Sequence, residues 1–213
     1  MKNIFIFGAG SVVKEICQII DKINKIKPTW KIVGFVDNDP NLSGKKLLGI
    51  PIIKFSELNE SEEFYGICGI VNPKLKERIV KKEILKKGYK LGTIIHPEID
   101  LPEDVRIEKG SIIFSGVQIS CNVKIGGCVW LDKNVLIGHD SSIGDFSSIL
   151  PSTIISGMCN LGRCCTIGAG AILHQNVSVG VNSLVGIGTT VTNDIQKNNS
   201  VINYPRNIVT KIK

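Results

Sequence analysis

The feature that most constrains this chain is a six-residue repeat that fills its C-terminal half. When residues 105–194 are written in sixes, the third position of all fifteen hexapeptides is aliphatic, and no insertion interrupts the run. These residues are Ile107, Ile113, Ile119, Ile125, Leu131, Ile137, Ile143, Ile149, Ile155, Leu161, Ile167, Leu173, Val179, Val185 and Val191. The next position is often glycine, and the first is mostly Val, Ser, Thr, Ala or Cys.

A period of six matches neither an α-helix nor an ordinary alternating strand. It predicts short strands separated by sharp turns, with three strands forming one coil of a parallel β-helix and the aliphatic position pointing inward. Fifteen hexapeptides make five coils, stacked at the ~4.8 Å spacing of paired strands. Small residues at the first position share the interior, which agrees with an aromatic content of only 6%.

Residues 1–97 follow a different plan, in which strand-like and helix-like segments alternate. Strands are expected at residues 2–7, 31–36, 50–53, 65–71 and 91–95. One helix is expected after the glycine turn at 8–10, with Ser11 as its N-cap, and a basic helix from Asn72 to about Lys87. This order predicts an α/β, Rossmann-like parallel sheet domain over residues 1–97, followed by the all-β domain over 98–213.

The chain carries 26 basic and 19 acidic residues, a formal charge of +7. Many lysines lie between Lys74 and Lys90, where they form either a solvated helix face or a surface that attracts anionic small molecules. No pairing of aromatic with basic residues indicates nucleic acid, and no apolar run approaches the ~20 residues of a membrane helix. Seven cysteines without CxxC spacing, and an N-terminus unlike a secretory signal, favour a reducing, cytoplasmic location.

The glycine turn after the first strand is a candidate nucleotide site, because backbone N–H groups at a helix N-terminus bind phosphate. Gly8 and Gly10 fit the dinucleotide fingerprint, but Val13 replaces its third glycine. Asp37 ends the second strand, where such folds hold a ribose hydroxyl. The pattern favours a small nucleotide-like ligand over NAD, and a tight turn without any ligand is the alternative.

The whole chain resembles a family of bacterial sugar acetyltransferases over residues 2–209. The resemblance rests on the segments IFGAG, FVDND, IVNPKLKERI, IIHPEI, IGHDSSIGDFSSI, VGIGTTVTNDI and NYPRNIV. The family comprises sialic acid O-acetyltransferases and N-acetyltransferases of nucleotide-linked 4-amino sugars. Membership implies a left-handed β-helix, acetyl-CoA as co-substrate, a nucleotide-sugar acceptor in surface-polysaccharide synthesis, and homotrimers with each site between neighbouring subunits.

In this family the residue that matches His139 is the general base, and the residue that matches Asp140 raises its basicity. The chemistry is sound, because a histidine titrates near pH ~6.5 and a nearby carboxylate stabilises its protonated form. With eighteen residues to a coil, Cys121 should lie beneath His139 and Gly157 above it. We interpret the glycine as space kept for a ligand.

The other two histidines are expected to have structural or surface roles. His174 should be a surface residue of the β-helix, with a contact to coenzyme A as the minority reading. His96, at the domain junction, should make a structural hydrogen bond. A zinc site of the carbonic anhydrase-like β-helix type needs two ligands about five residues apart, and no histidine pair here is that close, so no metal is expected.

The resemblance also suggests binding residues. The nucleotide of the acceptor would meet Gly10, Ser11, Asp37 and Asn38. Acetyl-CoA would run along the outside of the β-helix past Ser148, Gly157, Ala169 and Ile187. On charge alone, the candidates for binding the phosphates of coenzyme A are Arg163, Lys197 and Arg206.

Several positions depart from the family pattern. Val12 and Ser148 replace histidines, Val71 replaces a glycine, Asp132 stands where asparagine is common, and the tail at 203–207 is also atypical. The leading hypothesis is an acetyl-CoA-dependent N-acetyltransferase of a nucleotide-linked amino sugar. The alternatives are a sugar or sialic acid O-acetyltransferase and a non-catalytic binding or assembly module. A serine acetyltransferase is disfavoured, because those enzymes begin with a helical domain.

Overall fold

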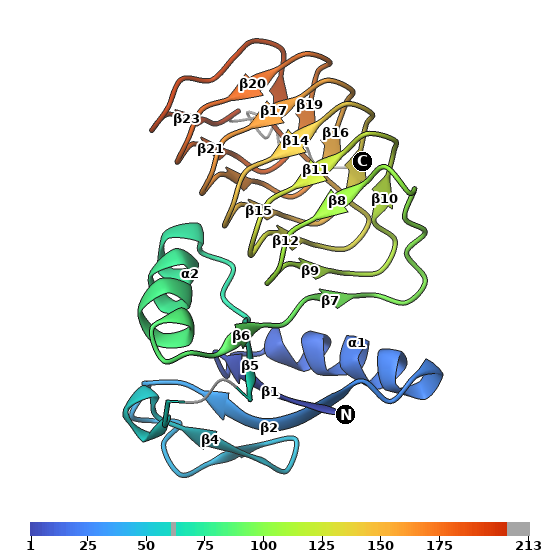
Figure 1. The fold of residues 1–213 in the computed structure, drawn as a ribbon. Coiled ribbons are helices and arrows are strands. Elements are labelled where there is room, and N and C mark those ends of the chain that lie inside the picture. The colour runs from blue at the N-terminus through green and yellow to red at the C-terminus, as the bar shows by residue number, and fades with distance from the viewer. Residues whose placement is uncertain (61–62, 204–213) are drawn as a thin grey trace, which may run out of the picture.

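The computed structural model describes residues 1–60 and 63–203. The N-terminal part is a six-stranded sheet in the order β3-β4-β2-β1-β5-β6 (Figure 1). Its pairs are parallel except for the antiparallel β3–β4 pair. The strands are β1 (Lys2–Phe7), β2 (Trp30–Val36), β3 (Lys46–Leu47), β4 (Ile50–Ile53), β5 (Tyr65–Cys68) and β6 (Lys90–Leu91). The Rossmann-like parallel sheet is therefore confirmed.

Helix α1 (Val13–Ile26) follows the glycine turn as expected, but Ser11 does not cap it. The residue before the helix is Val12, which makes no side-chain capping bond. Val13 lies against Gly69, and a Cβ added to Gly69 would fall 2.9 Å from Cγ2 of Val13. The close approach of helix and sheet is thus made possible by the glycine directly after β5 instead of the missing third glycine of the fingerprint.

The basic helix is shorter and less regular than predicted. Helix α2 (Pro73–Ile79) begins at an Asn72 side chain that accepts the Leu75 N–H at 3.0 Å, and it continues as a π-helix over Val80–Leu85. The wider π turn brings residues five apart onto one face. Ile79 and Ile84 are therefore both buried.

The segment expected as one strand at 91–95 is divided between the two parts of the molecule. β6 ends at Leu91 in the N-terminal sheet, whereas β7 (Ile94–Ile95) pairs with β9 (Ile112–Ile113) of the C-terminal part. The expected strand at 65–71 likewise ends at Cys68. The β-helix pairing thus begins at Ile94, directly after the last strand of the sheet domain.

The C-terminal part is the predicted left-handed parallel β-helix (Figure 1). Each hexapeptide supplies one two-residue strand, and strands eighteen residues apart pair with each other, as Gln118 does with Leu136. At the C-terminal end, β21 and β23 pair at a spacing of sixteen residues. We call the three sheets face 1 (β8, β11, β14, β17, β20), face 2 (β7, β9, β12, β15, β18, β21, β23) and face 3 (β10, β13, β16, β19, β22).

Together with β9, the remaining strands recur every six residues up to β22, whereas β23 begins ten residues after β22. They are β8 (Arg106–Ile107), β10 (Gln118–Ile119), β11 (Lys124–Ile125), β12 (Trp130–Leu131), β13 (Leu136–Ile137), β14 (Ser142–Ile143), β15 (Ser148–Ile149), β16 (Ile154–Ile155), β17 (Asn160–Leu161), β18 (Thr166–Ile167), β19 (Ile172–Leu173), β20 (Ser178–Val179), β21 (Leu184–Val185), β22 (Thr190–Val191) and β23 (Ser200–Val201).

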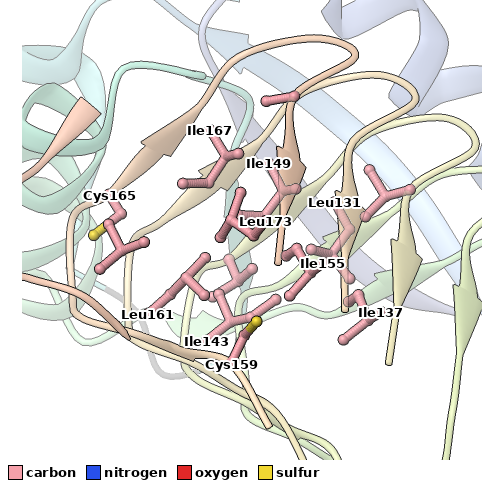
Figure 2. Close-up of a cluster of buried hydrophobic side chains, with 14 of the residues drawn as sticks. Leu131, Ile137, Ile143, Ile149, Ile155, Cys159, Leu161, Cys165, Ile167 and Leu173 are labelled. Carbon is pink, nitrogen blue, oxygen red and sulfur yellow. The ribbon is translucent and has the colours of Figure 1, made fainter. Parts of the chain in front are cut away.

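The aliphatic column fills the interior of the β-helix, as Figure 2 shows for residues between Leu131 and Leu173. The glycines that follow the aliphatic position do not have left-handed backbone. An added Cβ on Gly138 would lie 2.5 Å from the Gly157 nitrogen of the next coil, so glycine is needed for close stacking. The left-handed positions hold mainly asparagine and other non-glycine residues, such as Asn122 and Asp140.

The sheet domain packs on face 2 of the β-helix. Buried Phe114 and Trp130 of face 2 belong to the same apolar cluster as helix α1, and Figure 1 shows α1 beneath β7. Lys76 of α2 is 2% exposed, and its Nζ donates to the Ser147 carbonyl at 3.1 Å and to Ser148 Oγ at 2.9 Å. Burial lowers the pKa of Lys76 to about 8. A buried cation with two bonds into the β-helix fixes the two parts against each other.

Candidate active site

His139 stands at the corner between faces 3 and 1, in the turn that joins β13 to β14. Its Nδ1 lies 2.7 Å from Oδ2 of Asp140, and both side chains are about half exposed. Asp140 has a φ of 57°, so a left-handed turn directs its carboxylate back onto the preceding side chain. The structure thus brings together the two residues expected to be catalytic.

A third side chain holds the carboxylate from below. Asn122 donates from Nδ2 to Oδ1 of Asp140 at 2.7 Å, so each carboxylate oxygen has one partner. The bonds from His139 and then Asn122 lower the pKa of Asp140. The carboxylate is therefore ionised at neutral pH, where it favours a proton on Nδ1 and leaves Nε2 as the basic nitrogen. Asn122 was not predicted, although its place eighteen residues before Asp140 could have indicated it.

Gly157 lies above His139, as the repeat predicts, but the space it leaves is taken by the imidazole ring. An added Cβ on Gly157 would fall 2.6 Å from His139 Nε2. The Met158 N–H bonds to the His139 carbonyl at 2.8 Å, and the Asp140 N–H bonds to the Cys121 carbonyl at 3.1 Å. The expectation that the glycine keeps room for a ligand is therefore corrected, because the ring itself needs that room.

The sheet domain contains a cavity of about 290 Å³ at the carboxyl ends of β1 and β2. Asp37 and Asn38 line it, as predicted, whereas Gly10 and Ser11 are not among its lining residues. Asp37 accepts from the Ala9 N–H at 2.9 Å through Oδ2, and from the Asp39 N–H at 3.0 Å through Oδ1. It therefore ties the glycine turn to the end of β2 while it faces the cavity.

Two cations of the basic helix face the same cavity. Arg78 and Lys82 line it together with Gly8, Val36, Asp37, Asn38, Phe55, Ile70, Leu75, Ile79 and Glu83. Sequence reasoning treated this helix as a whole, as a solvated or anion-attracting face, and did not single them out. Their spacing of four residues on a helix was the available signal, because it puts both on one side.

The residues expected along acetyl-CoA are not brought together. Ser148 is fully buried, accepts from Lys76 and donates to the Val71 carbonyl at 2.6 Å. Its expected contact with a coenzyme outside the β-helix is therefore wrong. Ala169 and the 75% exposed Ile187 follow β18 and β21, so they lie at the corner between faces 2 and 3, whereas His139 lies at the other edge of face 3.

The charged candidates for the coenzyme phosphates differ in their surroundings. Arg163 pairs with Glu77 of α2, and Glu77 also pairs with Lys81 at 2.7 Å. The guanidinium group of Arg163 lies over the Phe146 ring, 6.0 Å from its centroid. Arg163 thus already has a carboxylate partner in the domain interface. Lys197 is exposed, and Arg206 lies outside the described residues.

The other two histidines agree with their expected roles. His96 is 2% exposed, and its Nε2 lies 3.0 Å from Lys22 Nζ of α1. Burial, and then the Lys22 charge, lower the pKa of His96. His174 is exposed, with Nδ1 3.2 Å from the Gln175 carbonyl. Within residues 1–60 and 63–203, no three His, Cys, Asp or Glu side chains are grouped as metal ligands.

The hexapeptide β-helix carries a histidine–carboxylate pair at a corner, and its sheet domain has a cavity lined by two basic and two acidic side chains. This arrangement indicates an acyltransferase. A family model described as the PglD N-terminal domain matches residues 3–83. GDP-perosamine N-acetyltransferase from Escherichia coli O157:H7 is 30% identical over 175 residues, which cover 81% of this chain and 78% of that protein. The chain therefore belongs to the hexapeptide-repeat sugar N-acetyltransferase family.

Solved structures agree on the fold. PerB from Caulobacter crescentus, determined with CoA and GDP-perosamine, superposes with a TM-score of 0.82 at 22% identity and covers 95% of both chains. The acetyltransferase domain of PglB from Neisseria gonorrhoeae FA1090 superposes with a TM-score of 0.85 at 22% identity, over 95% of this chain and 97% of that one. Within the described part of this chain, no helix has the length and apolar character to span a membrane.

Proposed function

We propose that this enzyme transfers an acetyl group from acetyl-CoA to the amino group of a nucleotide-linked amino sugar. The observation that carries the proposal is the 2.7 Å contact between His139 and Asp140 at an exposed corner. The curated relative that acts on GDP-perosamine supports the amino-sugar class of acceptor. A role in surface-polysaccharide or glycan synthesis follows from that class.

The nucleotide part of the acceptor fits the cavity of the sheet domain. Arg78 and Lys82 supply two cations for a diphosphate, and Asp37 supplies a carboxylate for ribose or base N–H and O–H groups. Gly8 has a φ of 107°, and an added Cβ would lie 3.0 Å from Ile70 Cδ1, so the chain approaches the cavity closely at this point. Gly10 and Ser11 stand next to this turn and remain proposed contacts for a phosphate.

The chemistry assigned to His139 is general base catalysis. Nε2 accepts a proton from the acceptor amine as its nitrogen lone pair attacks the thioester carbonyl of acetyl-CoA. The tetrahedral intermediate collapses, its C–S bond breaks, and the departing thiolate of CoA takes the proton from Nε2. Asp140 stabilises the imidazolium that exists between the two proton transfers.

The placement of the two sites supports a homotrimer with shared active sites. The sheet domain packs on face 2, whereas His139 lies at the corner opposite face 2. A nucleotide sugar held in the cavity would then meet the histidine of a neighbouring subunit. Face 3, which ends at this corner, presents a ladder of exposed apolar side chains from Leu136, Ile154 and Ile172. Such a patch is typical of a protein interface.

Acetyl-CoA would lie in the groove between neighbouring β-helices. We keep Ala169 and Ile187 as its proposed contacts, supplied by the subunit next to the one that provides His139. Exposed Lys197 remains a candidate for its phosphates. The seven cysteines are all unpaired, which supports a reducing compartment and hence action in the cytoplasm.

The proposal is tested by mass spectrometry of products. The enzyme is incubated with acetyl-CoA and, separately, with GDP-, UDP- and dTDP-linked amino sugars and free sialic acid. We expect a mass gain of one acetyl group on a nucleotide amino sugar, in a product stable to hydroxylamine. A hydroxylamine-labile product would instead assign O-acetylation. No product from any acceptor, together with no binding of acetyl-CoA by calorimetry, would favour the non-catalytic module.

A further inference from the structure

The corner that carries His139 also carries a ladder of polar side chains that ends at this histidine. Asp104, Asn122 and Asp140 are spaced eighteen residues apart, so they stack on successive coils. Asp104 Oδ2 accepts the Asn122 N–H at 2.8 Å, and Asn122 Nδ2 donates to Asp140 Oδ1 at 2.7 Å. The next position of the stack is Met158, which cannot donate a comparable hydrogen bond.

Asn122 is the one amide between two carboxylates in this stack, and its orientation is set from both sides. Its backbone is bound from below by Asp104, and its φ of 52° is the left-handed conformation that asparagine tolerates well. The side-chain amide therefore points up at Asp140. A carboxylate at the same place could accept but not donate, and it would repel both acidic neighbours.

The amide acts on the histidine only through the carboxylate. With Oδ1 of Asp140 held by Asn122, the other oxygen, Oδ2, is directed at His139 Nδ1. A carboxylate on Nδ1 selects the tautomer with its proton on Nδ1 and leaves the Nε2 lone pair free. Because Asp140 is exposed, its side chain needs such a second anchor to stay in one rotamer.

From this arrangement we infer that Asn122 is a positioning residue for the transfer reaction, which fixes Asp140 on His139 and so sets the imidazole tautomer. This inference rests on the proposed function for its kinetic consequence. Its structural part, the coupling of Asn122 to the His139 tautomer, stands without it.

Two variants separate the donor from the shape of the side chain. Asn122→Gly keeps the left-handed backbone without strain and removes the amide. Asn122→Asp keeps the shape and removes the donor. The matched control is Asn182→Gly, because Asn182 also has a left-handed φ of 64° and donates to a stacked neighbour, Asn198, at 2.8 Å. Asn182 lies at the corner between faces 1 and 2, away from His139.

We expect kcat to fall about tenfold in both Asn122 variants, the factor that one hydrogen bond to a charged group is worth, with KM values unchanged. The Asn182→Gly control should keep the wild-type kcat. The tautomer is read from nitrogen NMR spectra of ¹⁵N-histidine-labelled protein, in which the His139 signals are assigned by their loss in His139→Asn. The fraction with the proton on Nδ1 should fall in both Asn122 variants.

Two results would overturn the inference. One is a wild-type tautomer in Asn122→Asp and Asn122→Gly. The other is a fall in kcat that is matched by Asn182→Gly, which would mark a general effect of the ladder on the fold. If His139→Asn is itself fully active, the proposed function fails, and the NMR result still decides whether Asn122 controls the tautomer.

Discussion

The imidazole of His139 lies so close to Gly157 that an added Cβ would fall 2.6 Å from Nε2 and 2.8 Å from Cε1. Glycine at this position therefore sets where the candidate base can lie, and the ring occupies the space between two coils. The same ring is held at its other nitrogen by Asp140 at 2.7 Å. One contact restricts the ring by shape and the other by charge, so both should be needed for catalysis.

Gly157→Ala should push the imidazole away from Asp140 and lower kcat by at least about tenfold, the loss of one charged hydrogen bond. The fold should survive, because the ring is exposed and can rotate outward. The measurement is kcat together with the thermal unfolding midpoint. Gly127→Ala is the control, because its Cβ would meet nothing closer than 3.4 Å, and it should keep wild-type activity. Full activity in Gly157→Ala would show that the observed ring position is not the productive one.

Lys76 should give the stability of the protein a recognisable pH dependence. Burial lowers its pKa from 10.5 to about 8, so between these values the unfolded chain binds more protons than the folded one. The free energy of unfolding should therefore rise with pH in this window, by up to about 3 kcal/mol relative to Lys76→Met. Urea titrations of both proteins from pH 7.5 to 10.5, at one protein concentration, measure the difference.

The control for this prediction is Lys74→Met, which changes an exposed lysine of the same helix. The difference in free energy of unfolding between Lys74→Met and the wild type should not vary with pH. If the free energies of unfolding of Lys76→Met and the wild type differed by a constant amount over the whole pH range, Lys76 would keep its ordinary pKa and be reached by water.

Arg78 and Lys82 should determine the affinity for the nucleotide sugar. Arg78→Gln combined with Lys82→Gln should raise KM for the acceptor more than about tenfold, because two charge-assisted bonds to phosphate are lost, and should leave KM for acetyl-CoA unchanged. Initial rates at varied acceptor concentration give both constants. Lys86→Gln, an exposed lysine of the same segment outside the cavity, is the control. An unchanged acceptor KM would place the nucleotide elsewhere.

The apolar ladder on face 3 should hold the oligomer together. Leu136→Glu and Ile154→Glu put charges on side chains that are 40% and 38% exposed in the single chain. Burying such a charge in an interface is costly, so each variant should dissociate the proposed trimer into smaller species. Light scattering during gel filtration gives the mass. Leu184→Glu changes a side chain that is 41% exposed on face 2, and it should keep the mass of the wild-type protein. An unaffected mass in all three would put the interface on another surface.

The repeat made the β-helix predictable because each of its strands is specified by its own six residues. Because three hexapeptides make one coil, each strand is expected to pair with the strand eighteen residues away. The same spacing allowed Cys121, His139 and Gly157 to be stacked correctly from the sequence. The His139–Asp140 pair was expected from the family resemblance, and the structure makes the contact within a single turn.

What the sequence did not reveal depends on contacts between distant segments. Ser148 looks like a surface residue in the repeat, but its bonds to Lys76 and to the Val71 carbonyl place it in the domain interface. Arg78 and Lys82 are four residues apart on the predicted helix, but only the fold shows that this side of the helix lines the cavity with Asp37. The role of the Asn122 amide is defined by Asp140 one coil away, so the eighteen-residue spacing is what links the two in the sequence.

His139 is the proposed base, and the acetyl-transfer rate of His139→Asn tests this role most directly. Asparagine keeps a polar side chain of similar reach but cannot accept a proton at neutral pH. With a nucleotide amino sugar as acceptor, kcat should fall at least about 100-fold with KM nearly unchanged. His174→Asn, an exposed histidine at the end of β19 on face 3, should retain the wild-type rate. A His139→Asn rate within a few-fold of wild type would contradict the account.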